Sequence, residues 1–85
     1  MTYEITILPV AQHQLEKLEK NIQERILISL ERIKIRPYDF VKKLAGLPFY
    51  RLRVGDYRVI MKILNDAMII YVVEVGHRKN IYKDL

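Results

Sequence analysis

The sequence of 85 residues contains no cysteine and no tryptophan. Without thiols the chain has no disulfide and no thiolate nucleophile, and a structural zinc site, which usually depends on cysteine, is not expected. Histidine is scarce as well, because the sequence has two, His13 and His77, and neither has another ligand at metal-site spacing. We therefore expect a protein that holds no metal and no cofactor.

Long apolar runs are also absent. The runs fall well short of the ~20 residues that a membrane-spanning helix needs, and residues 1–4 lack a signal-peptide pattern. With 51% hydrophobic and 29% charged residues, the composition is that of a folded chain with a core. We expect a single cytoplasmic domain over residues 1–85, with no membrane partner.

Positive charge is in excess, and it is unevenly placed. The net charge is +5; residues 1–36 carry six Lys/Arg and five Glu, whereas residues 37–85 carry nine Lys/Arg and five Asp/Glu. A basic excess confined to one part of a chain favours a nucleic acid or an acidic protein as partner. A basic domain without such a partner is the alternative that charge alone leaves open.

The first half of the chain predicts a strand and two helices. Residues 3–8 alternate and are rich in β-forming side chains, and Pro9 suits the first turn of a helix over residues 9–19. Asn21 with Glu24 three residues later resembles a capping box, so we expect Asn21 to begin a second helix that Pro37 stops.

The second half predicts a connector over residues 38–48 and three strands at about residues 49–54, 57–64 and 68–75. The order β-α-α-β-β-β is that of an α+β fold. We expect an antiparallel sheet with an αα-hairpin packed on one face.

The first two of these strands meet at the pair Gly55-Asp56, which predicts a two-residue hairpin turn. Directly opposed residues share a face of the sheet, so Arg51, Arg53 and Arg58 fall on one face and the apolar residues on the other. Clustered like charges destabilise a sheet, which favours an anionic partner for this face.

The turn after the second of these strands is compatible with two or three residues. A two-residue loop would place Glu74 on the apolar face, where an unpaired carboxylate is costly. A three-residue loop places Glu74 opposite Arg58 and puts Tyr71, Val73 and Val75 with the apolar set. We expect the three-residue loop.

Arginine clusters bind phosphate through paired hydrogen bonds, and exposed aromatic rings such as Tyr38, Phe49 and Tyr82 can stack on unpaired bases. The combination suits single-stranded RNA. Six further basic residues are candidate RNA contacts: Arg53, Lys62, His77, Lys79, Lys42 and Lys43. For Lys42 and Lys43 a solvated loop is the alternative interpretation.

Cleavage of RNA needs little from a protein, because the 2′-hydroxyl is the nucleophile. Arg51, Arg58 and Arg78 are candidates for stabilising charge on the phosphorus. Either His77 or Tyr82 is a candidate for proton transfer. A solvated loop histidine and a packed aromatic anchor are the competing interpretations of these two residues.

The hairpin YRLRVGDYRV (residues 50–59) and the ending VGHR (residues 75–78) followed by Tyr82 resemble the RelE/ParE toxin superfamily. The resemblance covers essentially the whole chain. It implies a toxin of a type II toxin–antitoxin system that cleaves mRNA in the ribosomal A site. It also implies a RelB-like antitoxin as partner, in a toxin–antitoxin hetero-oligomer.

The resemblance implies roles for four residues. Arg51 stands where a strand lysine handles phosphate or protons, Arg58 where an arginine stabilises the transition state, and Arg78 where an arginine assists the leaving group. Tyr82 matches the tyrosine that stacks on the substrate or serves as base. The implied enzyme is a metal-independent endoribonuclease.

Two departures from the family pattern stand out. Phe49 occupies the position of the first strand lysine, and the spacing from Arg78 to Tyr82 is short. Two alternatives therefore remain: a ParE-like inhibitor of DNA gyrase without nuclease activity, and an inactive relative that only binds an antitoxin.

Overall fold

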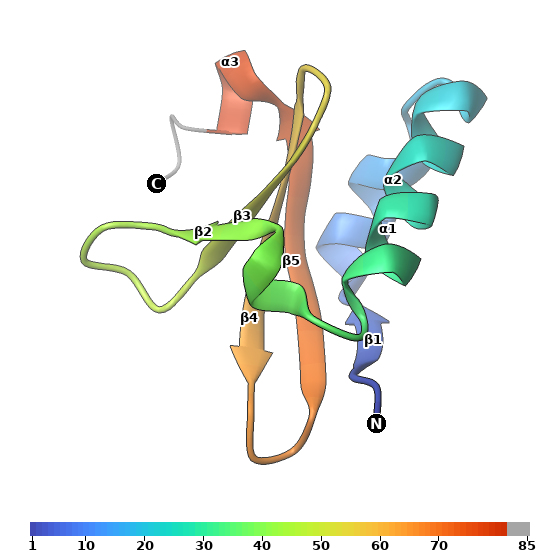
Figure 1. Cartoon of the computed structure of the whole chain (residues 1–85). Coiled ribbons are helices and arrows are strands. Elements are labelled where there is room, and N and C mark those ends of the chain that lie inside the picture. Colours follow the sequence, from blue (N-terminus) through green and yellow to red (C-terminus); the bar gives the residue numbers. More distant parts are fainter. Residues whose placement is uncertain (82–85) are drawn as a thin grey trace.

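The computed structural model describes residues 1–81, which form a five-stranded sheet with two helices on one face (Figure 1). Along the chain the elements are β1 (Glu4–Ile7), α1 (Pro9–Glu16), α2 (Lys20–Ile33), the 3₁₀ turn η1 (Pro37–Asp39), β2 (Val41–Lys43), β3 (Tyr50–Val54), β4 (Tyr57–Leu64), β5 (Ile69–His77) and α3 (Arg78–Ile81). The strand order is β1-β5-β4-β3-β2, and only β1 runs parallel to its neighbour. The predicted α+β fold is confirmed.

The helix boundaries differ from those predicted. The first helix ends at Glu16, three residues early, and the second begins at Lys20 with Glu19 as its N-cap and no side-chain cap. The prediction of Asn21 as N-cap is therefore wrong. The tight connection is closed instead by Gln23, whose Nε2 donates to the Leu18 carbonyl at 2.8 Å.

The predicted connector contains a strand that the sequence did not indicate. β2 pairs antiparallel with β3, Val41 standing opposite Leu52, and the Leu44 N–H donates to the Phe49 carbonyl at 2.9 Å beyond it. A strand of three residues is too short to show the alternation by which strands are recognised. Its consequence is a fifth strand at the sheet edge beside β3.

The β4–β5 register also differs. Leu64 pairs with Ile69, so the loop holds four residues, 65–68, and a β-bulge follows at Ile60/Met61. The expected three-residue loop, with Glu74 opposite Arg58, is wrong: Glu74 stands opposite Ile60. The face predicted for Glu74 is nevertheless right, because Ile60 and Arg58 lie on the same side of β4.

The bulge also redistributes the residues that were expected to share the apolar face. Val75 does pack in the core, opposite Val59. Tyr71 does not, because it pairs with Lys62 on the other face of the sheet. Val73 lies at the bulge without a partner in the ladder. Because the bulge inserts one residue in β5, only Val75 of the three residues expected on the apolar face lies there.

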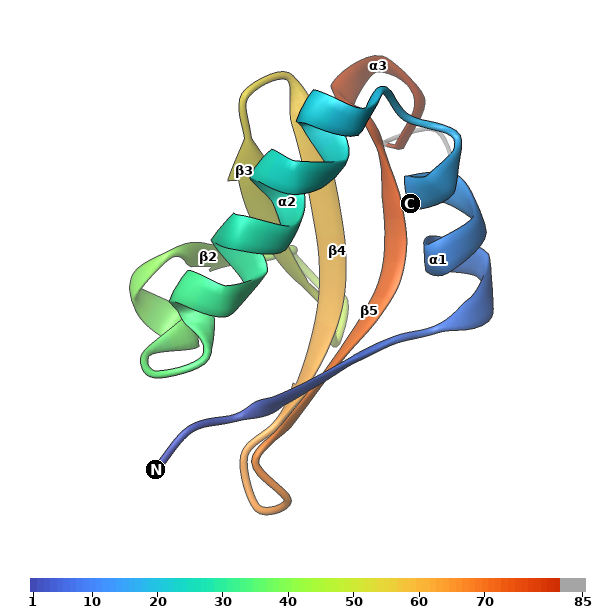
Figure 2. The same ribbon diagram turned by 90° about the vertical axis from the view of Figure 1, so that its right-hand side faces the viewer.

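The core lies between the two helices and the sheet face that they cover (Figure 2). The helices contribute Ala11, Leu15, Ile26, Leu30 and Ile33, and the sheet contributes Leu52, Val54, Val59, Met61, Ile70, Val72 and Val75. Burial of these side chains is the main stabilising term of the fold. No helix within residues 1–81 is long and apolar enough to cross a membrane.

Candidate functional site

The β3–β4 hairpin presents arginines on the sheet face that the helices leave uncovered. Val54 pairs with Tyr57 and Arg53 with Arg58, which confirms the two-residue turn. Gly55 opens the turn with a φ of +59°, a left-handed conformation that glycine adopts without strain. Because Leu52 and Val54 of this strand point into the core, Arg51 and Arg53, which alternate with them, point to the opposite face.

Strand β2 adds a lysine to this face. Lys42 pairs with Arg51, and Arg51 in turn stands opposite Ile60 on β4. Directly opposed side chains share a face, so Lys42 lies beside Arg51. We call the basic set on this side of the sheet the arginine face: Lys42, Arg51, Arg53, Arg58 and Lys62.

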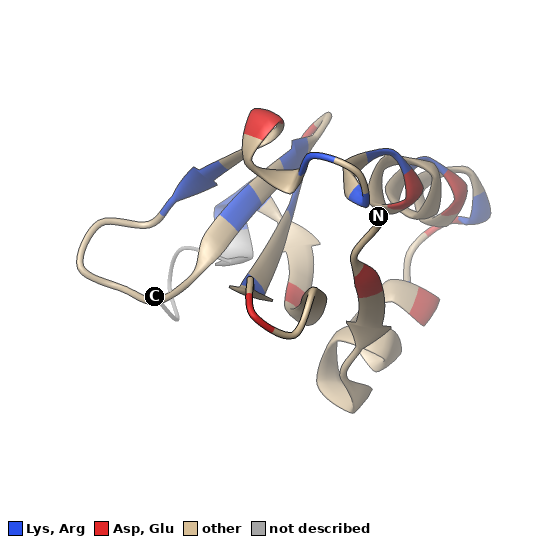
Figure 3. Ribbon diagram, turned by 60° about the horizontal axis from the view of Figure 1, so that its bottom comes forward, with Lys and Arg blue, Asp and Glu red and all other residues tan. Residues whose placement is uncertain are grey.

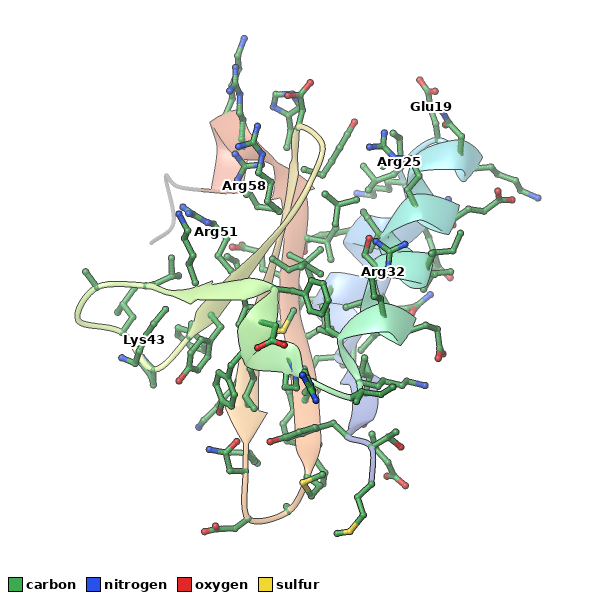
Figure 4. All side chains as sticks on the ribbon, viewed as in Figure 1. Glu19, Arg25, Arg32, Lys43, Arg51 and Arg58 are labelled. Carbon is green, nitrogen blue, oxygen red and sulfur yellow. The ribbon has the colours of Figure 1, made fainter. Side chains whose placement is uncertain are left out.

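Lys43, the sequence neighbour of Lys42, lies on the other side. It pairs with Tyr50, and its Nζ donates to the Leu47 carbonyl at 3.0 Å. Figure 4 shows Lys43 and Arg51 on opposite sides of the β2–β3 ribbon. The structure therefore separates two lysines that the sequence treated as a pair.

Arg58 is the most constrained of these residues. Its side chain is 7% exposed, and its Nη1 donates to the carbonyls of Gly55 at 3.2 Å and Tyr57 at 3.1 Å. Its Nε is buried and has no hydrogen-bond partner in the described part of the chain. A buried donor without an acceptor costs free energy, so this guanidinium holds an unused donor.

The residues after β5 approach the same hairpin. The Arg78 N–H donates to the Asp56 carbonyl at 2.9 Å, which fixes the start of α3 against the Gly55-Asp56 turn. Arg58 donates to the Gly55 carbonyl of the same turn. The side chains of Arg78 and Lys79 are exposed. Tyr82, the fourth candidate catalytic residue, lies outside the described residues.

His77 is not brought to the arginine face. It stands opposite Tyr57, and the two rings make an edge contact with centroids 5.5 Å apart. Its Nδ1 accepts the Lys79 N–H at 3.2 Å. Since Tyr57 shares its face with Val59, His77 points to the helix side of the sheet.

Tyr38 is also directed away from the arginines. Its ring contacts Tyr50 edge-on at 5.3 Å, and its hydroxyl donates to Asn65 Oδ1 at 2.7 Å. Burial raises the pKa of Tyr38 above its ordinary value of 10.0. Phe49 is half-buried immediately before β3.

Basic residues are concentrated on the three neighbouring strands β2, β3 and β4. In Figure 3, Lys and Arg positions follow β2, β3 and β4, whereas basic and acidic positions alternate along α2. Lys42 was a candidate RNA contact from the sequence, but β2 was not predicted, and its pairing with β3 is what places Lys42 beside Arg51. No three His, Asp or Glu side chains within residues 1–81 come together as a metal site.

The arrangement can hold a phosphate group. Guanidinium and ammonium groups donate charge-assisted hydrogen bonds to phosphate oxygens, and a half-buried site screens them less than water does. Arg58 offers a fixed donor, with Arg51 and Lys42 on the adjoining strands.

Comparison with known proteins gives a consistent result. Residues 5–82 match the family described as the ParE toxin of the type II toxin–antitoxin system, parDE. A putative RelE-like toxin protein of Escherichia coli is 28% identical over 82 residues, which cover 93% of this chain and 86% of that protein.

Solved structures agree. A chain of the archaeal RelE–RelB complex from Pyrococcus horikoshii superposes with a TM-score of 0.80 at 30% identity, covering 94% of this chain and 99% of that one. A chain of the RelBE2 toxin–antitoxin complex from Mycobacterium tuberculosis gives a TM-score of 0.85 at 21% identity, covering 92% and 100%, and shares the fold.

Proposed function

This chain belongs to the RelE/ParE superfamily and is a toxin of a type II toxin–antitoxin system, and we propose that it acts as a ribosome-dependent endoribonuclease that cleaves mRNA. The observation that carries the proposal is Arg58. Arg58 is 7% exposed, and its buried Nε has no hydrogen-bond partner in the described part of the chain. An unpartnered buried donor costs free energy, and a phosphate oxygen that accepts from this guanidinium would offset that cost.

The proposed reaction is a transesterification on the RNA itself. The 2′-oxygen bonds to the adjacent phosphorus as the bond from phosphorus to the 5′-oxygen breaks, which leaves a 2′,3′-cyclic phosphate and a 5′-hydroxyl. The proton of the 2′-hydroxyl leaves to a base, and a proton reaches the departing 5′-oxygen. The protein has to align the two oxygens in line and stabilise the additional charge.

Arg58 is proposed to stabilise the phosphorane, because the hydrogen bonds from its Nη1 to the Gly55 and Tyr57 carbonyls fix the guanidinium and leave the donors of Nη2 and Nε for phosphate oxygens. Arg51 and Lys42 hold the neighbouring phosphate in register. Arg78, next to the same turn, assists the departing oxygen. The proposed base is Tyr82, on the family resemblance, and the position of His77 on the helix side of the sheet argues against His77 in that role.

The proposed partners are a cognate RelB-like antitoxin, mRNA and the ribosomal A site, which places the protein in the cytoplasm. Relatives solved as RelE–RelB complexes support a toxin–antitoxin hetero-oligomer. Lys62, Lys79 and Arg53, all exposed, extend the basic surface available to RNA.

The test is expression of the chain with and without substitutions on the arginine face. The proposal expects the wild type to arrest translation and Arg58→Ala or Arg78→Ala to relieve the arrest. Full arrest by both variants, at matched protein levels, contradicts the catalytic roles.

A second candidate function is inhibition of DNA gyrase, which the match to the ParE family over residues 5–82 favours. It requires no catalytic residue on the arginine face. Purified gyrase separates the two: loss of supercoiling activity on adding this chain supports the ParE-like function, and unchanged supercoiling together with cleaved transcripts supports the nuclease.

A further inference from the structure

A second basic site lies at the tip of the β3–β4 hairpin, on the side covered by α2. A pocket of about 340 Å³ opens there. The residues that line it come from α2 and from the end of β3: Arg25, Ile28, Ser29, Arg32, Arg53, Val54 and Gly55. Three of the seven are arginines and none is acidic.

The helix sets the spacing of two of these arginines. Arg25, Ser29 and Arg32 follow the i, i+4, i+7 pattern of one helix face, so about 10 Å of helix separates the two arginines. The small Ser29 between them leaves room for the pocket floor. Figure 4 shows both arginines along α2, with Arg25 turned toward the hairpin.

The third arginine, Arg53, belongs to the arginine face and borders the pocket at the open edge of the sheet. The β2–β3 ladder ends at Leu52, so Arg53 has no neighbour on the β2 side. Its Nε donates to the Gly55 carbonyl at 3.4 Å. Gly55 also admits Arg25, since a Cβ at this position would lie 3.0 Å from Arg25 Nη2.

The fold does not neutralise this cluster. Within residues 1–81, Arg25 and Arg32 make no hydrogen bond or ion pair through their side chains, and the salt bridge on the helix joins Lys34 to Glu31. Two arginines on the helix and a third at the pocket edge repel one another and gain no ion pair from the described residues of the fold. An anion in the pocket would offset this repulsion.

We propose that this pocket binds a phosphodiester of RNA, at a position on the helix side of the sheet that adjoins the arginine face at Arg53. The inference rests on the proposed function and extends it. RNA is favoured over an acidic peptide because Arg53 stands directly opposite Arg58 in the β3–β4 ladder. One backbone can pass from the arginine face around the hairpin tip into the pocket, in contact with arginine throughout.

The experiment measures binding without cleavage. A short fluorescent single-stranded RNA, methylated at every 2′-oxygen so that it has no nucleophile, is titrated with the full chain at several salt concentrations. Each phosphate contact on a single strand contributes about 0.7 to the slope of log affinity against log salt. The double variant Arg25→Gln/Arg32→Gln is expected to lower that slope by about 1.4.

The matched control removes the same charge elsewhere. Lys17 and Lys20 are exposed and lie outside the pocket lining, so Lys17→Gln/Lys20→Gln is expected to keep the wild-type slope. If Arg25→Gln/Arg32→Gln and Lys17→Gln/Lys20→Gln give the same salt slope, the proposal is overturned, whether that slope is lower than the wild-type slope or equal to it. So does a wild type whose RNA affinity is independent of salt.

A second pair of variants leaves the arginines in place. Ser29→Glu puts a carboxylate between Arg25 and Arg32 at helical pairing distance, so it should occupy the pocket and lower the slope as the double variant does. Ser29→Gln, neutral and of similar size, should not. If Ser29→Glu retains the slope, phosphate does not enter here.

Two further outcomes are separable. If the double variant keeps its RNA slope and instead weakens binding of the cognate antitoxin, the pocket holds an acidic peptide and the RNA proposal is wrong. Cleavage of unmodified mRNA by the wild type is scored independently. A chain that shows the slope change but cleaves nothing retains this site and loses the proposed function.

Discussion

Lys42 stands directly opposite Arg51 across the β2–β3 ladder, on the face away from the helices. This pairing bears on the main departure from the family pattern, the presence of Phe49 where a strand lysine is expected. The second basic group beside Arg51 is Lys42 of β2, whereas the family pattern has a lysine at position 49, two residues before Arg51. The arginine face thereby keeps a second basic group beside Arg51, as the proposed binding of phosphate requires.

Lys42 and Lys43 make a matched pair for testing this assignment. Lys42→Gln removes a charged donor from the arginine face, and loss of a charge-assisted hydrogen bond of about 1.5–3 kcal/mol should lower cleavage about 10- to 100-fold. Lys43→Gln should leave cleavage within about twofold, because that side chain lies on the other face. Rates are measured on mRNA in a purified translation system. If Lys43→Gln lowers cleavage more than Lys42→Gln does, the β2–β3 register does not determine which lysine acts in cleavage.

Arg58→Met should separate activity from stability. The substitution removes a buried Nε that has no acceptor, but it also removes the two hydrogen bonds from Nη1 to the Gly55 and Tyr57 carbonyls, so the free energy of unfolding should stay within about 1 kcal/mol of the wild-type value. Cleavage should fall at least about 100-fold because transition-state charge loses its fixed donor. Urea unfolding and cleavage assays give the two readouts.

Ile60→Ala is the control for that experiment. Ile60 is 1% exposed and belongs to the same strand face, so its truncation should cost about 2–4 kcal/mol. An Arg58→Met protein that is destabilised as strongly as Ile60→Ala would make Arg58 a structural residue.

Gly55→Ala and Gly46→Ala test the hairpin tip. Both positions have a positive φ, +59° and +72°, so each alanine should cost about 1 kcal/mol of stability, measured by thermal unfolding. The two differ in space: a Cβ at Gly55 would meet the Arg25 guanidinium, whereas Gly46 has nothing within 4 Å. Because Arg25 can swing aside, the difference should appear as weaker RNA binding by Gly55→Ala alone. Equal RNA affinities would mean that the position of Arg25 does not matter.

Gln14 satisfies the backbone beside the β-bulge. Its Oε1 accepts the Val75 N–H at 2.8 Å, across the interface of α1 and β5. Gln14→Ala leaves that partly buried N–H without a partner and should cost about 1–3 kcal/mol in urea unfolding. Gln12→Ala, exposed and bonded weakly to Glu16 at 3.4 Å, should cost less than about 0.5 kcal/mol. If Gln14→Ala and Gln12→Ala lower the free energy of unfolding by similar amounts, the hydrogen bond from Val75 to Gln14 does not contribute as expected.

The elements that the sequence predicted well are those whose evidence is local. The pair Gly55-Asp56 sets the hairpin turn, and alternation then sets which arginines share a face, so Arg51 and Arg58 were placed correctly. Pro9 at the first turn of α1 and the apolar stripe of α2 are equally local features.

What the sequence did not predict depends on distant partners. The bulge at Ile60/Met61 shifts β5 by one residue, and nothing near Glu74 in the sequence records that shift. Lys42 and His77 were both candidate residues, but which face each occupies is set by pairing with distant residues, Lys42 with Arg51 and His77 with Tyr57. Asn21 has a good capping composition, but the chain begins α2 earlier, where Gln23 closes the connection.

The central claim is that this toxin cleaves mRNA, and mapping the 5′ ends of transcripts after its induction tests that claim most directly. If the protein cleaves mRNA through Arg58, new 5′-hydroxyl ends appear inside translated codons in cells that express the wild type, and none appear in cells that express Arg58→Ala at the same level. Intact transcripts in growth-arrested wild-type cells would contradict it.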